Sequence, residues 1–96
     1  MLILITYDVS TQTDAGKRRL RHVAKCCQDY GLRVQNSVFE CVLDAAQLAL
    51  VRHRLESLID PNADSLRFYN LGNRSAAKVT HIGAKPTADM EEPLIL

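Results

Sequence analysis

The chain has 96 residues, of which 47% are hydrophobic and 24% are charged. This length and composition predict one folded domain and leave too few residues for two. The formal net charge of +1 excludes the overall basicity that would by itself indicate nucleic-acid binding. Residues 1–83 are predicted to form the domain, and residues 84–96 a C-terminal tail that is either disordered or docked on a partner.

Hydropathy and cysteine usage favour a cytoplasmic protein. No segment approaches the ~18 to 20 apolar residues that a membrane-spanning helix needs, and the amino terminus lacks the features of a secretory signal. The cysteine count is odd and two cysteines are adjacent, which argues against a disulfide framework. Cys26, Cys27 and Cys41 are therefore predicted core residues. The histidines are too far apart in sequence to indicate a zinc site.

The first predicted elements are a strand and a helix. Residues 2–9, LILITYDV, are predicted to form a central strand buried on both faces, with Asp8 at its C-terminal end. Open sheets tend to place ligands and metals at that end. A polar segment then leads to Asp14, a candidate N-cap. Apolar residues recur at helical spacing up to Tyr30, and Gly31 is predicted to end this helix.

The middle of the chain predicts further strand structure and a second helix. Residues 32–43 have a strand-like pattern, which polar residues 35–37 interrupt as either a bend or a very short hairpin. Asp44 and Gln47 form a capping-box-like start for an amphipathic helix. This helix is predicted to end before Asp60-Pro61.

Two more strands complete the predicted fold. Residues 66–71 are predicted as a strand with apolar residues on both faces, and residues 78–82 as a shorter last strand at the sheet edge or lent to a partner. The order predicts a ferredoxin-like βαββαβ sandwich of the α+β class, with an antiparallel sheet and both helices on one face. The opposite face is then apolar, so a homodimer through the sheet is predicted.

Positive charge gathers in the first predicted helix. Its basic block consists of Lys17, Arg18, Arg19, Arg21 and Lys25, with His22 among them. This block is either a solvated helix face or a surface that contacts a phosphate backbone, with an affinity that falls as salt is added.

Three motifs together resemble the CRISPR-associated protein 2 family. They are TYDV at the end of the first strand, the helix sequence GKRRLRHVAK, and YGLRVQNSVFEC at residues 30–41. The resemblance covers residues 1 to about 83. It implies a homodimer that binds RNA or duplex DNA and partners the CRISPR integrase subunit, CRISPR-associated protein 1, in acquiring new spacers. The family is similar to virulence-associated protein D, a toxin-type endoribonuclease on the same scaffold.

The resemblance also implies a magnesium site at Asp8. In the family, the aspartate after the strand-one tyrosine faces its symmetry mate across the dimer and holds a magnesium ion used in phosphodiester cleavage. Magnesium often uses only one or two carboxylates, with water and substrate phosphate as its other ligands. Such an ion lowers the pKa of a bound water and stabilises charge on the phosphate. From the residues alone, the alternative is that Asp8 caps the loop at the backbone of Ser10.

The same motifs suggest further site residues. The predicted nucleic-acid contacts are Arg18, Arg21, Arg33 and Ser37. Tyr7 either positions a phosphate or packs beneath the sheet, and Phe39 is assigned to the core or the dimer seam. No general base is apparent, because Glu40 is interpreted as a strand glutamate on the solvent face.

Three functions stay open on this basis. The first is a metal-dependent nuclease that needs Asp8 in both subunits. The second is a non-catalytic scaffold that lays its arginines along a DNA duplex and measures its length for the integrase; it needs the basic helix and the C-terminal region. The third is a toxin-type endoribonuclease acting on messenger RNA.

Overall fold

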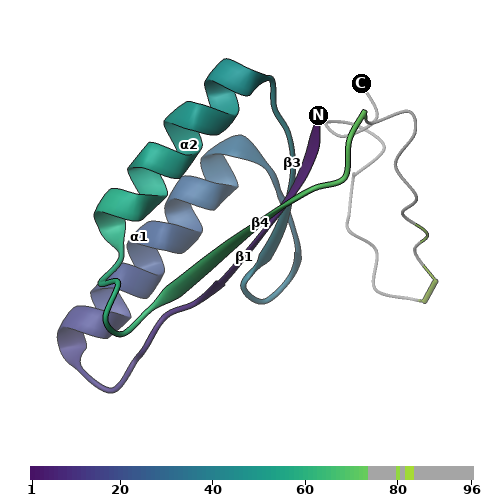
Figure 1. The fold of residues 1–96 in the computed structure, drawn as a ribbon. Helices are drawn as coiled ribbons and strands as arrows, with labels where there is room; N and C mark the ends of the chain where they lie inside the picture. Colours follow the sequence, from purple (N-terminus) through teal and green to yellow (C-terminus); the bar gives the residue numbers. More distant parts are fainter. Residues whose placement is uncertain (74–79, 81, 84–96) are drawn as a thin grey trace.

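A four-stranded sheet and two helices make up the described part of the chain (Figure 1). The elements are β1 (Leu2–Asp8), α1 (Asp14–Tyr30), β2 (Leu32–Gln35), β3 (Val38–Val42), α2 (Ala45–Leu58) and β4 (Ser65–Asn70). The computed structural model describes residues 1–73, 80, 82 and 83. The predicted strand at residues 78–82 lies mostly outside the described residues, and the predicted tail at 84–96 lies wholly outside them.

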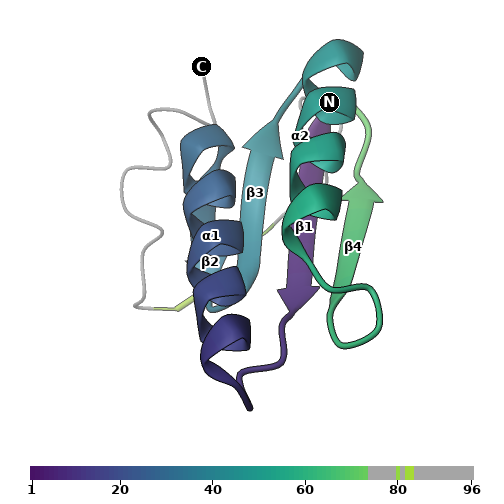
Figure 2. The same ribbon diagram turned by 90° about the vertical axis from the view of Figure 1, so that its left-hand side faces the viewer.

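The strands lie in the order β2-β3-β1-β4, and every neighbouring pair is antiparallel. Figure 2 shows both helices on the same face of this sheet. The predicted ferredoxin-like α+β fold is therefore confirmed, with β1 as an inner strand. Neither described helix is long and apolar enough to cross a membrane.

Only one face of strand β1 is buried along its whole length; on the other face Leu2 is buried but the later residues are not. Ile3 and Ile5 have no exposed surface, whereas Leu4 and Thr6 are half-buried and Asp8 is exposed. Successive side chains of a strand point to opposite faces, so the second set lies on the face that the helices leave uncovered. The prediction of two buried faces is wrong for a single chain, because the helices cover only one side of the sheet.

The core fills the space between the sheet and the helices. Its fully buried side chains are Phe39, Ile3, Ile5, Leu55, Val23, Val51, Cys27 and Cys41. Burying an aliphatic or aromatic side chain of this kind stabilises the fold by ~1.5 to 3 kcal/mol. The cysteines are core residues, as predicted, and Cys26 is also buried. Burial raises the pKa of Cys27 and of Cys41 to about 12, so both stay thiols at neutral pH.

The helix starts differ in how well the sequence predicted them. The capping box of α2 is confirmed: the Gln47 N–H donates to Asp44 at 2.7 Å, and the Asp44 N–H donates to the Gln47 side chain at 3.0 Å. The N-cap of α1 is Thr13, whose hydroxyl accepts from the Gly16 N–H at 3.0 Å. Asp14 is instead the first helical residue, where its charge suits the positive end of the helix dipole.

Helix α1 ends at Tyr30, as predicted. Glycine is needed at residue 31 because of close packing and not because of a left-handed backbone conformation. Its backbone is extended, with φ −159°, rather than left-handed. A Cβ at this position would overlap the Sγ of Cys41 and the carbonyl oxygen of Glu40. A side chain at residue 31 would therefore push the end of α1 away from β3.

Of the two possibilities predicted for residues 35–37, a bend or a very short hairpin, the structure has the hairpin. Strand β2 ends at Gln35 and β3 begins at Val38, so Asn36 and Ser37 make the turn. Ser37 has φ 66°, a left-handed conformation that is uncommon for residues other than glycine. The turn brings Ser37 to the C-terminal end of β1.

Candidate functional site

Asp8 ends β1 at the edge of the uncovered sheet face. Its side chain is exposed, and its backbone pairs in register with Ser65 at the start of β4. Within the described residues, no hydrogen bond or ion pair engages its carboxylate. A carboxylate in this state is available to a ligand from outside the chain.

The predicted alternative role for Asp8, capping the loop at Ser10, is wrong. The Ser10 N–H donates to Oδ1 of Asp64 at 3.0 Å. Asp64 precedes β4 and lies far from Ser10 in the sequence, so this contact could not be predicted from the residues around Ser10.

Four of the predicted site residues contact one another near the end of β1 and in the β2–β3 hairpin. The side chains of Tyr7, Phe39 and Arg33 lie on the helix side of the sheet, and that of Asp8 lies on the other side. The Tyr7 N–H donates to the carbonyl oxygen of Ser37 at 3.1 Å. The rings of Tyr7 and Phe39 stack with centroids 6.2 Å apart, and the guanidinium carbon of Arg33 lies 5.1 Å from the Phe39 ring centroid. Tyr7 and Phe39 are 6% and 0% exposed, so both pack in the core of one chain and Phe39 leaves no surface for a dimer seam.

The polar side chains of Arg33 and Ser37 are accessible to solvent. The Arg33 side chain is exposed at the sheet edge, and its stacking on Phe39 restricts the direction of the guanidinium. Ser37 is half-buried in the hairpin turn. Contact of either residue with a phosphate stays a prediction.

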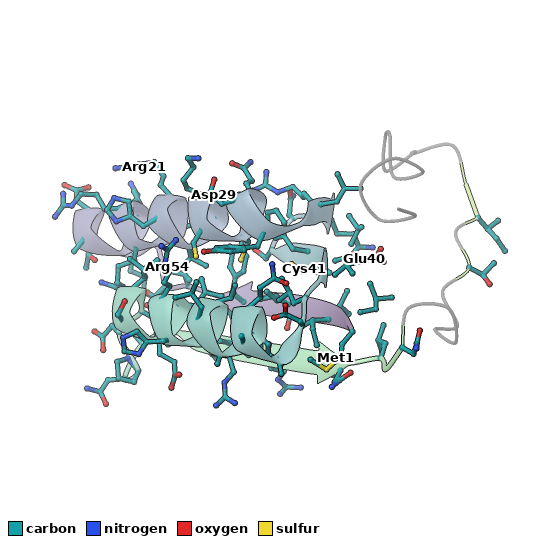
Figure 3. All side chains as sticks on the ribbon, turned by 90° about the horizontal axis from the view of Figure 1, so that it is seen from above. Met1, Arg21, Asp29, Glu40, Cys41 and Arg54 are labelled. Carbon is teal, nitrogen blue, oxygen red and sulfur yellow. The ribbon has the colours of Figure 1, made fainter. Side chains whose placement is uncertain are left out.

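Arg18 and Arg21 lie on a different surface from Asp8. Both are exposed on α1, and Figure 3 shows Arg21 on the side of that helix away from α2. The exposed basic residues of α1 recur at helical spacing and are called the basic stripe below. They are Lys17, Arg18, Arg21, His22 and Lys25. The basic stripe follows the helix layer, whereas Asp8 lies on the opposite face of the sheet.

Arg19 does not belong to the basic stripe, because it forms an ion pair with Asp64. Its Nε donates to Oδ2 of Asp64 at 2.8 Å, and Nη2 lies 3.4 Å from Oδ1. The Asp64 side chain is fully buried, and its Oδ2 also accepts from the Asp60 N–H at 2.9 Å. The hydrogen bond from Arg19, with those from Asp60 and Ser10, lowers the pKa of Asp64 to about 2.

Sequence reasoning missed the ion pair, although one signal was present. Arg19 lies four residues before Val23 and seven before Cys26, which places it on the buried stripe of the predicted helix. A charged residue on that stripe requires a partner, but its identity depends on tertiary structure.

Glu40 also differs from its prediction. It lies on the sheet face that the helices leave uncovered, but it is only 8% exposed rather than solvated. In the register of the sheet it lies opposite Leu4 on β1 and Leu32 on β2.

The donor set at Asp8 fits a mostly hydrated magnesium ion. No group of three or more histidine, cysteine, aspartate or glutamate side chains that could hold a metal occurs among the described residues. One chain therefore offers Asp8 and no protein cage within that part. A hard cation that keeps several waters needs only one or two carboxylates, so an ion shared by Asp8 from two chains is compatible with these residues.

A groove of about 640 Å³ is a separate feature of the surface. It lies between α2 and β4, with Leu48, Arg52 and Phe68 among its lining residues. Figure 2 shows β4 beyond the area that α2 covers. The groove is on the helix side of the sheet, so it does not contain Asp8.

Comparison with known proteins gives a consistent family assignment. The family model described as CRISPR associated protein Cas2 matches residues 1–79. The CRISPR-associated endonuclease Cas2 of Halalkalibacterium halodurans is 61% identical over 95 residues, covering 99% of each chain. The CRISPR-associated endoribonuclease Cas2 of Nitratidesulfovibrio vulgaris is 60% identical over 96 residues, covering 100% of this chain and 94% of the relative. The crystal structure of Streptococcus pyogenes Cas2 has a TM-score of 0.74 at 54% identity, covering 86% of this chain and 100% of that chain.

Proposed function

Because the chain belongs to the CRISPR-associated protein Cas2 family, we propose that it is a magnesium-dependent endonuclease that acts as a homodimer on RNA or duplex DNA. The observation that carries the proposal is the exposed Asp8 carboxylate, which has no partner among the described residues. The endonuclease and endoribonuclease names of the relatives support it. The proposal includes a cytoplasmic location and a partnership with CRISPR-associated protein 1, the integrase subunit, in acquiring new spacers.

The homodimer in this proposal forms through the uncovered sheet face. Val42 and Tyr69 are 39% and 42% exposed, and Leu4 and Val38 on the same face are half-buried. An apolar face of this kind gains stability when a second copy of the chain covers it. In a dimer with a two-fold symmetry axis, the same face of both subunits forms the interface. Since Asp8 lies on the same face, such an axis brings two copies of its carboxylate together.

The residues around Asp8 have complementary tasks in this proposal. Asp8 of both subunits holds the cation, which when bound supplies an activated water and neutralises charge on the phosphate. Arg33, held over Phe39 on the helix side of the sheet, is a phosphate contact outside the Asp8 site in this proposal. Tyr7 packs under the sheet and holds the end of β1 beside the hairpin turn at Ser37.

A cleavage assay tests this function. Labelled single-stranded RNA and duplex DNA are incubated with the parent, Asp8→Ala and Asp29→Asn, each with magnesium or with a chelator. We expect cleavage by the parent only with magnesium, a loss of at least about a hundredfold in Asp8→Ala, and unchanged nucleic-acid binding by that variant. Asp29→Asn controls for the loss of an exposed carboxylate and should cleave like the parent. Cleavage by Asp8→Ala at the parental rate would refute the nuclease assignment.

A non-catalytic scaffold is the second candidate function. The basic stripe favours it, because a row of exposed cationic side chains on α1 is suited to contact a phosphate backbone, on the opposite side of the sheet from Asp8. A scaffold in this sense binds a DNA duplex and presents it to the integrase without cutting it. The same assay decides: duplex binding without cleavage by the parent favours the scaffold. The family match favours either of these two functions over the toxin-type alternative.

A further inference from the structure

The backbone on both sides of Asp8 is held by contacts with other parts of the chain. Before Asp8, the Tyr7 N–H is bound by the carbonyl oxygen of Ser37 at 3.1 Å. After it, Val9 is 8% exposed in the core, and the Ser10 N–H is bound by Asp64 at 3.0 Å. Asp8 therefore stands on a short backbone segment that is held at both ends.

Asp64 holds more than the Ser10 amide. Its two oxygens also accept hydrogen bonds from Arg19 on α1 and from the Asp60 N–H in the loop before β4. These contacts connect the loop after β1, the helix α1 and the start of β4 through one fully buried carboxylate. The next residue, Ser65, is the one that pairs with Asp8 in the sheet. Asp64 thus binds the segment after Asp8 and precedes by one residue the strand residue that pairs with Asp8.

Gly16 gives an independent reason why the Ser10 segment has one position. A Cβ on Gly16 would overlap the carbonyl oxygen of Ser10 and come within 3.3 Å of the Thr13 hydroxyl. The first turn of α1 therefore presses directly against the Ser10 backbone. Asp64 binds the N–H of Ser10 while Gly16 allows close contact at its C=O, so the residue is confined from two directions.

We propose that Asp64 is a positioning residue for Asp8: together with Arg19 and the glycine at position 16 it fixes the Ser10 segment, and so the backbone position from which the Asp8 carboxylate extends. This inference rests on the proposed role of Asp8 as a metal ligand. Asp8 has no side-chain partner of its own among the described residues, so the backbone on either side of it sets the direction of its Cα–Cβ bond and thereby the region that its carboxylate can reach. Two carboxylates that share one ion must both point correctly, and each depends on its own copy of Asp64.

The test uses Asp64→Asn, which keeps the shape of the side chain but removes its charge. Hydrogen exchange at the Ser10 amide, followed by NMR, reports whether the segment is still held. We expect this exchange to be at least about tenfold faster in Asp64→Asn. We also expect kcat for magnesium-dependent cleavage to fall by about ten- to a hundredfold with KM nearly unchanged, because a small displacement of a catalytic group affects the chemical step.

Two further variants probe the same segment from other sides. Gly16→Ala inserts a methyl group against the Ser10 carbonyl oxygen, so the Ser10 segment or the first turn of α1 must shift, and we expect kcat per folded molecule to fall. Arg19→Lys keeps the cation but loses the two-nitrogen contact with Asp64, and we expect an intermediate kcat. Val51→Ala, a core change in α2, is the control for lost stability, and its kcat per folded molecule should equal that of the parent.

The outcomes separate this inference from the function on which it rests. If Asp64→Asn leaves Ser10 exchange unchanged, or speeds it while kcat stays parental, the positioning role is overturned. If the parent shows no Asp8-dependent cleavage, the proposed nuclease function fails, and Ser10 exchange alone decides whether Asp64 fixes the segment. If Val51→Ala lowers kcat as much as Asp64→Asn, the effect is one of stability, and the positioning role is likewise overturned.

Discussion

Neighbouring arginines of α1 differ in environment although the sequence presents them as one block. Arg18 and Arg21 are exposed, whereas Arg19 is 22% exposed at its side chain and bound to a buried carboxylate. The difference follows from the helical repeat, which turns residue 19 toward Val23 and the core. Asp64, which is not part of any sequence motif, therefore holds several segments together at this end of the molecule. Because Arg19 is bound to Asp64, we do not expect it to contact nucleic acid.

The Arg19–Asp64 pair predicts how stability depends on pH. The folded state lowers the pKa of Asp64 from 3.8 to about 2, so the pair stabilises the fold above pH ~4 and loses this contribution as the pH falls toward 2. We expect Asp64→Asn to lower the free energy of unfolding by about 2 to 4 kcal/mol at pH 7, since Arg19 loses its counter-ion. Urea unfolding of parent and variant should give a difference that shrinks between pH 4 and 2. A difference that is constant over that range would contradict the role of the ionised carboxylate.

At the level of elements, α1 has two separate faces. One packs Val23 and Cys27 into the core, and the other carries the basic stripe. Lys25 is partly neutralised by its ion pair with Asp29 at 2.7 Å, whereas Arg18 and Arg21 form no hydrogen bond or ion pair through their side chains among the described residues. These two arginines are therefore the strongest candidates for contacts with a phosphate backbone.

Charge reversal tests the basic stripe. Arg18→Glu and Arg21→Glu should each weaken duplex binding and reduce the slope of log affinity against log salt by about 1, because each arginine that contacts a phosphate releases about one counter-ion. Arg52→Glu, an equal charge change on the exposed part of α2, is the control and should have a smaller effect. Fluorescence anisotropy with a labelled duplex over a salt series measures both quantities. Equal slopes in all three variants would remove the stripe as a specific contact surface.

For the whole molecule, the central feature is that two helices cover one side of a four-stranded sheet. The uncovered side carries apolar residues on inner strands, including Leu4 on β1 and Val42 on β3, and it carries Asp8 at its edge. Stability and a two-chain metal site would therefore arise from the same contact between copies.

Substitution on this face tests the dimer. Val42→Glu places a charge on the uncovered sheet face, where Val42 is already 39% exposed, so the single chain should stay folded while self-association is lost. Leu50→Glu is the matched control, because Leu50 is 46% exposed on α2 and lies on the helix layer. Sedimentation velocity should give a dimer for the parent and Leu50→Glu and a monomer for Val42→Glu. A dimeric Val42→Glu variant would place the interface elsewhere.

The sequence predicted the elements well because their signals are local. The capping box at Asp44, the apolar repeat of both helices and the two strand-like runs on either side of residues 35–37 depend on neighbours in the chain. Predictions that depended on distant contacts were less complete: the buried pair of Arg19 and Asp64 was missed, and Glu40 was placed in solvent. At the candidate site, Asp8 and its neighbours were selected by family motifs, whereas the contacts that hold Ser10 required the folded structure.

The most direct measurement counts bound metal ions per chain. Manganese, as a spectroscopic substitute for magnesium, is titrated into the parent and Asp8→Asn and followed by electron paramagnetic resonance. If two copies of Asp8 share a cation across a dimer, the parent binds one ion for every two chains and Asp8→Asn binds none at that site. One ion per chain, or equal binding by both proteins, would contradict the shared site.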